Sequence, residues 1–388
     1  MVSVARQIAA KALEDWEITE TLASERIEEL VSERTIDRRD AYLAREIAGG
    51  VLRHRRAIDA TLAAFSDRPL KSLEPGLLRA LRIGAFELLY LDRVPARASV
   101  NEAVDLAREN SSRGAEKMAN AVLRKVADAK IGVIPDRRDL LTSGSPLFDR
   151  RRFLLPSRDG SAIELSRPVL SDPIVNFAGW LAPAFSLPDI YVRELLRRYD
   201  RAAILRIADA TVSIPPLTVR INERRLPSPD FPLTAIFEGL DAEPDAVPLP
   251  VADRTDGGLA IPESGAMTRL FRLPRGIPVG VLPGLQSGYF VAQDPSAAAV
   301  VPFLDLKPNQ RVLDLCAAPG GKTRQIADAV RAGKITAMDS AIDRVSSLRD
   351  NIRRASADDI VTVEALDATQ IGEKSPSAFD RILVDAPC

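Results

Sequence analysis

The sequence predicts a multidomain chain in which an all-helical bundle precedes a doubly wound α/β domain. Three observations support this prediction. Over residues 1 to about 130, apolar residues recur at helical spacing with almost no strand pattern. Over residues 312 to 385, apolar runs that each end in an acidic residue recur at the spacing of βα units. A Pro-Gly-Gly turn, Pro319 to Gly321, follows the first of these runs, where an α/β sheet places a nucleotide site.

Length and composition set limits on the function. The 388 residues suffice for two or three domains, and a net charge of −1 predicts no single-sign field, so any RNA contact must come from local patches. Two cysteines, Cys316 and Cys388, form no disulfide framework and fit a reducing cytoplasm. No apolar run approaches the roughly 20 residues of a membrane span. The single histidine, His54, excludes a His-based triad or a typical His metal cluster.

The helical prediction for residues 1–130 rests on apolar residues that recur every three or four positions, with charged residues on the opposite faces. Pro75 suits the first turn of one of these helices. A basic cluster, Arg53 to Arg56, lies beside an apolar series. It suits contact with RNA phosphates, which position a nucleic acid without reading its sequence. The alternative is a solvated helix face, and for His54 an ordinary exposed or packed side chain is favoured over catalysis.

Residues 131–180 are predicted to be a linker or surface insertion, because helical periodicity stops and proline, glycine, serine and arginine accumulate. Residues 181–285 are predicted to form a small α/β subdomain. In it, Asp189 can cap a helix, and Leu217 to Asn222 alternates as a strand. Its polar residues, Arg220 and Asn222, would share one face and meet either a nucleotide or solvent.

Two further strands, Val279 to Leu282 and Gly288 to Ala292, are expected to lead into Gln293 to Ser296. The helix from Ala297 to Leu304 would then cover a cofactor pocket. Residues 286–388 are assigned to the α/β domain, whose predicted strands are Val312 to Leu315, Lys334 to Met338, Val361 to Leu366 and Arg381 to Val384.

The glycine turn allows two kinds of nucleotide site. Gly321-Lys322-Thr323 suggests a phosphate loop, but that pattern requires glycine at the position of Cys316, and Pro319 removes an N–H from the loop. The other interpretation is an S-adenosylmethionine site, in which Asp339 would bind the ribose hydroxyls and Asp367 the adenine amino group. A structural alternative is that acidic residues merely cap the ends of strands.

The motifs Asp314-Leu-Cys-Ala-Ala-Pro-Gly-Gly-Lys322 and Asp385-Ala-Pro-Cys388 resemble those of RNA cytosine carbon-5 methyltransferases of the RsmB/Sun (Fmu) group. Gln293-Asp-Pro-Ser296 also resembles the motif that precedes their catalytic core. Three helical segments, Ala44 to Arg53, Leu81 to Tyr90 and Met118 to Arg124, resemble the NusB-like RNA-binding fold that this group carries in front of the core.

This resemblance implies a NusB-like bundle followed by a Rossmann-like, class I methyltransferase core that uses S-adenosyl-L-methionine. It implies 16S rRNA or a pre-ribosomal small-subunit particle as partner, a cytoplasmic location, a monomer when full length, and no metal. The implied catalytic residues are Cys388, Asp385 and Lys322. The implied cofactor-binding residues are Cys316, Ala317, Ala318, Pro319, Gly320, Gly321, Lys322, Asp339, Asp367 and Asp385.

In the mechanism that the resemblance implies, a cysteine thiolate adds to carbon 6 of cytosine, and the neighbouring carbon 5 then accepts the methyl group. Cys388 would assist release of the adduct, Asp385 would bind the cytosine edge, and the nucleophile would lie in a Thr-Cys-Ser motif further along the chain. We therefore expect the sequence to be a fragment with an incomplete core that binds cofactor weakly and turns over negligibly. Rival hypotheses are a non-catalytic NusB-class RNA-binding protein and a phosphate-loop NTPase.

Overall fold

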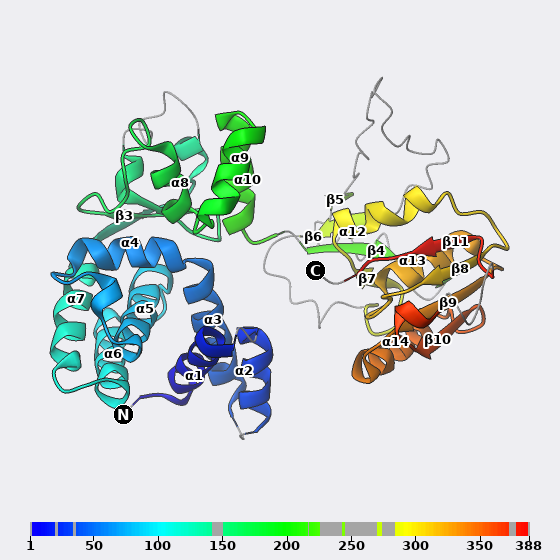
Figure 1. The fold of residues 1–388 in the computed structure, drawn as a ribbon, viewed down its shortest axis with the longest axis horizontal. Helices are drawn as coiled ribbons and strands as arrows, with labels where there is room; N and C mark the ends of the chain where they lie inside the picture. Colours follow the sequence, from blue (N-terminus) through cyan, green and yellow to red (C-terminus); the bar gives the residue numbers. More distant parts are fainter. Residues whose placement is uncertain are drawn as a thin grey trace. The chain divides into compact units, whose positions relative to one another are not determined.

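The computed structural model describes residues 2–19, 22–33, 36–141, 150–215, 217–225, 243–244, 270–273, 284–371 and 378–386. The chain forms two compact units, an N-terminal unit of Met1–Pro215 and a C-terminal unit of Pro216–Cys388 (Figure 1). No helix among these residues is both long enough and apolar enough to span a membrane.

The first part of the N-terminal unit is a helical bundle, as predicted. Its helices are α1 (Val4–Thr19), α2 (Ala23–Ser32), α3 (Arg38–Arg53), α4 (Arg55–Phe65), α5 (Pro75–Tyr90), α6 (Ala96–Asn110) and α7 (Ala115–Ala129), with a 3₁₀ turn, η1 (Leu70–Ser72). Pro75 occupies the first turn of α5, where its missing N–H leaves no bond unmade.

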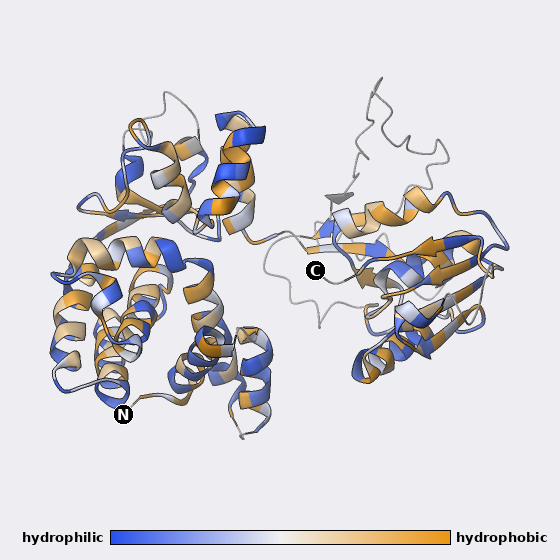
Figure 2. Ribbon diagram, in the orientation of Figure 1, coloured by the Kyte–Doolittle hydropathy of each residue, from blue (hydrophilic) through white to orange (hydrophobic). Residues whose placement is uncertain are grey.

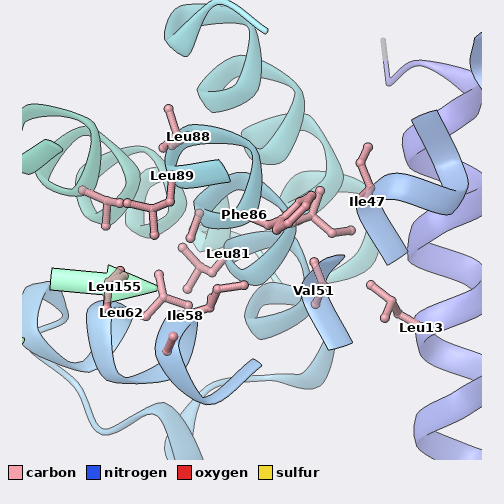
Figure 3. Packing of buried hydrophobic residues seen from close by; sticks show 14 of the residues in the cluster. Leu13, Ile47, Val51, Ile58, Leu62, Leu81, Phe86, Leu88, Leu89 and Leu155 are labelled. Atoms are coloured by element: carbon pink, nitrogen blue, oxygen red, sulfur yellow. The ribbon is translucent and has the colours of Figure 1, made fainter. Parts of the chain in front are cut away.

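Helix α5 is the centre of the bundle because nearly its whole circumference is buried. Figure 3 shows Phe86 and Leu81 of α5 among apolar side chains of neighbouring helices, including Ile58 and Val51. Gly50 of α3 is required at this point, since a Cβ there would stand 1.9 Å from Cζ of Phe86. The surrounding helices are amphipathic, and Figure 2 shows mixed hydropathy along them.

The basic cluster Arg53 to Arg56 is used inside this unit. His54 is buried and its ring stacks on Tyr90 with centroids 4.1 Å apart, so the expectation of a packed side chain is confirmed. Arg55 lies over the ring of Trp16 at 5.1 Å. Arg56 donates to the carbonyl of Leu187 at 2.6 Å and to Asp189 at 2.7 Å. The basic cluster is therefore not a simple solvated helix face.

Residues 130–215 add a second layer to the same unit. Strands β1 (Lys130–Ile134), β2 (Leu154–Pro156) and β3 (Ala162–Leu165) form an antiparallel sheet of order β1-β3-β2. Helices α8 (Phe177–Ala184), α9 (Asp189–Arg198) and α10 (Arg201–Val212) follow, with the 3₁₀ turns η2 (Arg138–Leu141) and η3 (Arg151–Phe153) before β2.

The structure differs here from the linker expected over residues 131–180. Leu155, Ile163 and Trp180 are buried in the same apolar cluster as the helical bundle. Arg137 is also buried and donates to Asp209 at 2.6 Å, which ties η2 to α10. The strands are only three to five residues long and are separated by proline and arginine, so their sequence looks like a loop.

The C-terminal unit begins with a small antiparallel sheet of order β5-β6-β4-β7. Its strands are β4 (Leu217–Ile221), β5 (Glu243–Pro244), β6 (Leu270–Leu273) and β7 (Phe290–Ala292), with a 3₁₀ turn, η4 (Glu223–Arg225), after β4. The strand predicted at Val279 to Leu282 lies outside the described residues. Asp189, expected to cap a helix, instead lies in the first turn of α9, after Pro188 at the cap position.

The parallel sheet of this unit contains the four predicted strands, in the order β10-β9-β8-β11. It is built from β8 (Arg311–Asp314), β9 (Lys334–Asp339), β10 (Val361–Ala365) and β11 (Arg381–Leu383). The helical elements are α12 (Pro295–Val300), η6 (Val301–Leu304), α13 (Gly321–Val330), α14 (Ile342–Arg354) and η7 (Ala368–Gln370). Apolar residues of α13 and α14 form one cluster with Val312 and Ile335 of the sheet.

Candidate cofactor site and catalytic pair

The glycine turn joins the carboxyl end of β8 to the start of α13. Ala317 donates its N–H to the carbonyl of Met338 at 2.8 Å, and Gly320 donates to Ala317 at 2.7 Å. The Ala318–Pro319 peptide is cis, and Gly320 has φ +98°, a conformation that glycine adopts without strain. These bonds hold the turn against the end of β9, the neighbouring strand.

The two glycines of the turn have different surroundings. A Cβ on Gly320 would lie 2.8 Å from Cδ1 of Leu348, so this position packs against α14. A Cβ on Gly321 would meet no atom within 4 Å, so open space adjoins the start of α13. Because the N–H groups of a first helical turn lack partners within the helix, this open side can accept a polar ligand. The residues present therefore fit a bound nucleotide-like group.

A hydrogen bond between Asp314 and Thr323 joins β8 to α13. Asp314 is 1% exposed, and its Oδ2 accepts a hydrogen bond from Oγ1 of Thr323 at 2.7 Å. Burial raises the pKa of Asp314 to about 6, which the Thr323 hydrogen bond offsets only in part. The Thr323 hydroxyl is thus committed to a buried carboxylate, which argues against its use as the magnesium ligand of a phosphate loop.

Asp339 lies at the end of β9 and is only 2% exposed. Its carboxylate accepts the N–H groups of Ala341 at 3.1 Å and Ala318 at 3.4 Å, so it bridges the turn and α14. Arg344 is ion-paired with it at 2.9 Å. Sequence reasoning missed Arg344, although its position five residues after the acid, on the first turns of a helix, was a usable signal.

Asp367 follows β10, at the same edge of the sheet as Asp339. It is exposed, and its carboxylate accepts the N–H of Thr369 at 2.9 Å and the Thr369 hydroxyl at 2.8 Å. These hydrogen bonds hold the pKa of Asp367 below its usual value. The strand-capping alternative therefore describes part of its role in this structure, and its Oδ2 accepts no side-chain or backbone hydrogen bond from the residues that the structure describes.

The structure brings Lys322 and Asp385 together. Nζ of Lys322 lies 2.5 Å from Oδ2 of Asp385, so the first turn of α13 is joined to the segment after β11. Asp385 is half-exposed, whereas the Lys322 side chain is mostly covered. A cation and a carboxylate thus lie together beside the turn, with the carboxylate half-exposed to a polar ligand.

Of the two cysteines, Cys316 lies within the described residues, in the glycine turn. Cys316 is partly buried in the turn, and burial together with the nearby carboxylates Asp339 and Asp314 raises the pKa of its thiol. A raised pKa keeps the thiol protonated at neutral pH, which fits a packing role better than nucleophilic attack. Cys388, predicted to be catalytic, lies outside the described residues.

A buried polar network joins the small sheet to α13. Arg220, 2% exposed, donates its Nε to Oε1 of Gln293 at 2.7 Å and is ion-paired with Asp328 of α13. Gln293 in turn donates to Gln325 at 3.1 Å, and Gln325 donates to the carbonyl of Ala298 at 2.8 Å. The expectation that Arg220 faces a nucleotide or solvent is wrong, because its partners are buried protein groups.

Asn222 and Arg224 extend the same connection. Asn222 donates to the carbonyls of Gly288 and Ala355 at 2.8 and 2.9 Å, and it is also buried rather than exposed as predicted. Arg224 donates to the carbonyls of Ser356 and Arg331. These bonds fix the end of β4 to the carboxyl ends of α13 and α14.

The fold and site define a class: a helical bundle joined to a parallel α/β domain whose glycine turn fits a nucleotide-like ligand. Comparison with known proteins makes this specific. The NusB family matches residues 3–128, and the 16S rRNA methyltransferase RsmB/F family matches residues 301–388.

Curated relatives match nearly the whole chain. A probable ribosomal RNA small subunit methyltransferase B of Synechocystis sp. is 28% identical over 386 residues, which are 99% of this chain and 74% of that protein. The corresponding Bacillus subtilis protein is 27% identical over 385 residues, 99% of this chain and 73% of its own length. The crystal structure of PH0851 covers the whole chain and 75% of its own, with TM-score 0.53 and 17% identity, and supports the fold alone.

The chain therefore joins a NusB-family domain to a domain of the 16S rRNA methyltransferase RsmB/F family. Its helical bundle followed by a parallel α/β sheet is the predicted fold class, which is confirmed. Membership of this methyltransferase family implies, in general, the use of S-adenosylmethionine.

Proposed function

We propose that the protein methylates carbon 5 of one cytosine in 16S rRNA, with S-adenosyl-L-methionine as methyl donor. The observation that carries the proposal is the Lys322–Asp385 pair, 2.5 Å apart, beside a glycine turn with open space at Gly321. This combination offers a polar contact for a base next to a cofactor groove. The RsmB/F family match over residues 301–388 supports the choice of rRNA as the substrate.

The cofactor groove in this proposal is formed by the turn from Cys316 to Lys322 and by the acids after β9 and β10. Asp339, buried but adjoining the turn through Ala318, would accept the ribose hydroxyls. Arg344 would have to release one carboxylate oxygen for that contact. Asp367 would accept the adenine amino group with the oxygen that Thr369 leaves free. When bound, the cofactor supplies a methyl group activated on a sulfonium.

The target base requires activation because carbon 5 of cytosine is a weak nucleophile. Addition of a cysteine thiolate to carbon 6 moves electron density onto carbon 5, and later loss of the carbon-5 proton and of the thiolate restores the aromatic ring. In this proposal Asp385 binds the cytosine edge, and Lys322 holds that carboxylate in place. Cys388 assists release of the adduct, and Cys316 takes no part in covalent chemistry.

The base has to leave its stack to reach Asp385. Unstacking costs a few kcal/mol, and less in a loop than in a helix, so a single-stranded or loop cytosine of the rRNA is the favoured target. The proposed partner is 16S rRNA or a pre-ribosomal small-subunit particle. The NusB-family domain would supply RNA contacts that position this partner.

Two measurements test the proposal. Disruption of the reading frame in the source organism should remove one 5-methylcytosine from 16S rRNA, and an intact copy should restore it, whereas a copy with Asp385→Asn should not. In vitro, the purified chain should bind S-adenosylhomocysteine and not ATP. An unchanged methylation pattern, or ATP binding without S-adenosylhomocysteine binding, would refute the proposal.

A further inference from the structure

Two arginines lie against the carbonyl side of the glycine turn. Arg324, on the first turn of α13, donates its Nε to the carbonyl oxygen of Gly320 at 3.1 Å. Arg354, the last residue of α14, donates to Oδ1 of Asn351 at 2.8 Å, and Asn351 donates to the carbonyl of Pro319 at 2.8 Å. The two guanidinium groups are therefore connected to adjacent residues of the turn, Arg324 directly to Gly320 and Arg354 to Pro319 through the Asn351 side chain.

The charged groups around Arg324 are mainly other arginines. The charged groups that act on Arg324 are Arg220, Arg354 and Asp328, and Asp328 is already ion-paired with Arg220. Within the described ranges neither Arg324 nor Arg354 forms an ion pair. Arg324 thus lies near two other arginines and near Asp328, whose carboxylate is already committed to Arg220.

Like charges held together in a partly buried place are unfavourable unless a counter-charge completes the arrangement. Burial, followed by the repulsion of Arg220 and Arg354, lowers the pKa of Arg324 to about 10. Only Nε of Arg324 and one terminal nitrogen of Arg354 have protein acceptors among the described residues. The remaining guanidinium N–H groups can form a fork, which matches the oxygens of a phosphate.

Arg324 is not explained by the cofactor site. It contacts the carbonyl of Gly320, while a nucleotide in the groove would approach the N–H groups at the start of α13 and the open side of Gly321. It also forms no hydrogen bond within the described network that joins the small sheet to the core, whose members are Arg220 of β4, Gln293, and Gln325 and Asp328 of α13.

We propose that Arg324 and Arg354 form a binding site for one phosphate of the RNA backbone, behind the glycine turn and separate from the cofactor groove. The proposal rests on the proposed function, because it takes RNA as the polyanion. The site carries no base specificity, and it anchors the substrate to the turn that holds the cofactor.

The test is RNA affinity as a function of salt, measured on the full chain with a 20-nucleotide stem–loop RNA. The variants are Arg324→Gln and Arg354→Gln. Each should reduce the slope of log affinity against log salt by about 1, because one phosphate contact is lost. Raising the salt from 50 to 200 mM should therefore weaken RNA binding by about 4-fold less in each variant than in the parent.

Matched controls separate a phosphate contact from a folding defect. Arg353→Gln removes the neighbouring arginine of α14, which is 67% exposed and ion-paired with Asp350, and should leave the slope unchanged. Arg324→Lys keeps the charge and should retain the slope. S-adenosylhomocysteine affinity in the absence of RNA should be the same in the parent and in both glutamine variants.

Three results would overturn the phosphate site: an unchanged slope in both glutamine variants, an equal loss in Arg353→Gln, or a loss in Arg324→Lys equal to that in Arg324→Gln. Failure of the proposed function looks different. In that case the parent chain itself does not bind S-adenosylhomocysteine, whatever the salt dependence of RNA binding.

Discussion

The two units of the chain are stabilised in different ways. The N-terminal unit has one large apolar cluster that runs from the bundle into the sheet and helices of residues 130–215, beside a small one around Leu140, Leu154 and Ala162. The C-terminal unit has separate clusters for its parallel sheet and its small antiparallel sheet, and buried polar side chains join the two. Apolar burial is strong but non-directional, whereas hydrogen bonds fix one geometry. In the unit that holds the candidate site, polar bonds therefore fix how its two sheets meet.

The unfolding of each unit can be measured separately. Both tryptophans, Trp16 and Trp180, belong to the N-terminal unit, and both cysteines, Cys316 and Cys388, belong to the C-terminal unit. Tryptophan fluorescence therefore follows unfolding of the first unit. Thiol labelling during urea unfolding follows the second.

The largest effect is expected for Arg220→Met in the C-terminal unit. The substitution leaves the Asp328 carboxylate buried without its cation, and it removes the bond to Gln293. Breaking a buried pair in this way costs about 3–5 kcal/mol. Thiol labelling should become faster at low urea while tryptophan fluorescence stays unchanged. Arg353→Met, which breaks only an exposed pair, is the control, and an equal effect in it would contradict the role assigned to Arg220.

The next effect is expected for Gly50→Ala in the N-terminal unit. The added Cβ would stand 1.9 Å from the Phe86 ring, so α3 and α5 must move apart, which costs about 2–3 kcal/mol. The adjacent substitution Gly49→Ala places its Cβ in open space and should instead stabilise the helix by about 0.5–1 kcal/mol. The two midpoints in tryptophan-monitored urea unfolding should shift in opposite directions. A shift of both in one direction would show that packing against Phe86 is loose.

The pH dependence of the N-terminal unit should come in part from His54. Burial lowers the pKa of His54 to about 3, so the folded unit keeps it neutral while the unfolded chain binds a proton below about 6.5. The stability that neutral His54 contributes is thus present above pH 6.5. It is lost on acidification, by about 2 kcal/mol between pH 7 and pH 5. In His54→Phe this part of the loss should vanish in tryptophan-monitored unfolding. An identical pH profile in parent and variant would rule out a neutral, buried His54.

The smallest effect is expected for Asp314, whose contribution to stability changes with pH in the opposite direction to that of His54. Because the folded-state pKa of about 6 exceeds that of the unfolded chain, the folded unit binds the extra proton. Stability from this group is therefore present below about pH 4 and is lost as pH rises to about 6, by about 1.5 kcal/mol between pH 4.5 and pH 6. Asp314→Asn keeps an acceptor for Thr323 and should remove that slope in thiol-labelled unfolding. A variant with the same slope as the parent would show that Asp314 is ionised throughout.

The sequence predicts some parts of the fold and not others. The helical bundle and the positions of the parallel strands were predictable because both leave periodic patterns or fixed motifs in the sequence. The layer over residues 130–165 was not, since its strands are short and their burial depends on the bundle beneath them. The buried roles of Arg220 and Asn222 were also missed, because their partners, Asp328 and Ala355, lie more than 100 residues away.

At the candidate site, the motif predicted which residues gather at the turn but not how they pair. The Lys322–Asp385 contact joins positions 63 residues apart, and the contact of Arg344 with Asp339 competes with the ligand contact expected there. Pairings of this kind depend on side-chain distances that only the folded sheet defines.

The central claim is that the glycine turn binds the methyl donor, and a crystal structure with S-adenosylhomocysteine tests it most directly. The account predicts density for the ligand beside Gly320 and Gly321, with its ribose hydroxyls on Asp339 and Arg344 displaced from one carboxylate oxygen. Density at another place in the C-terminal unit, or an unaltered Arg344–Asp339 pair with the turn vacant at saturating ligand, would contradict it.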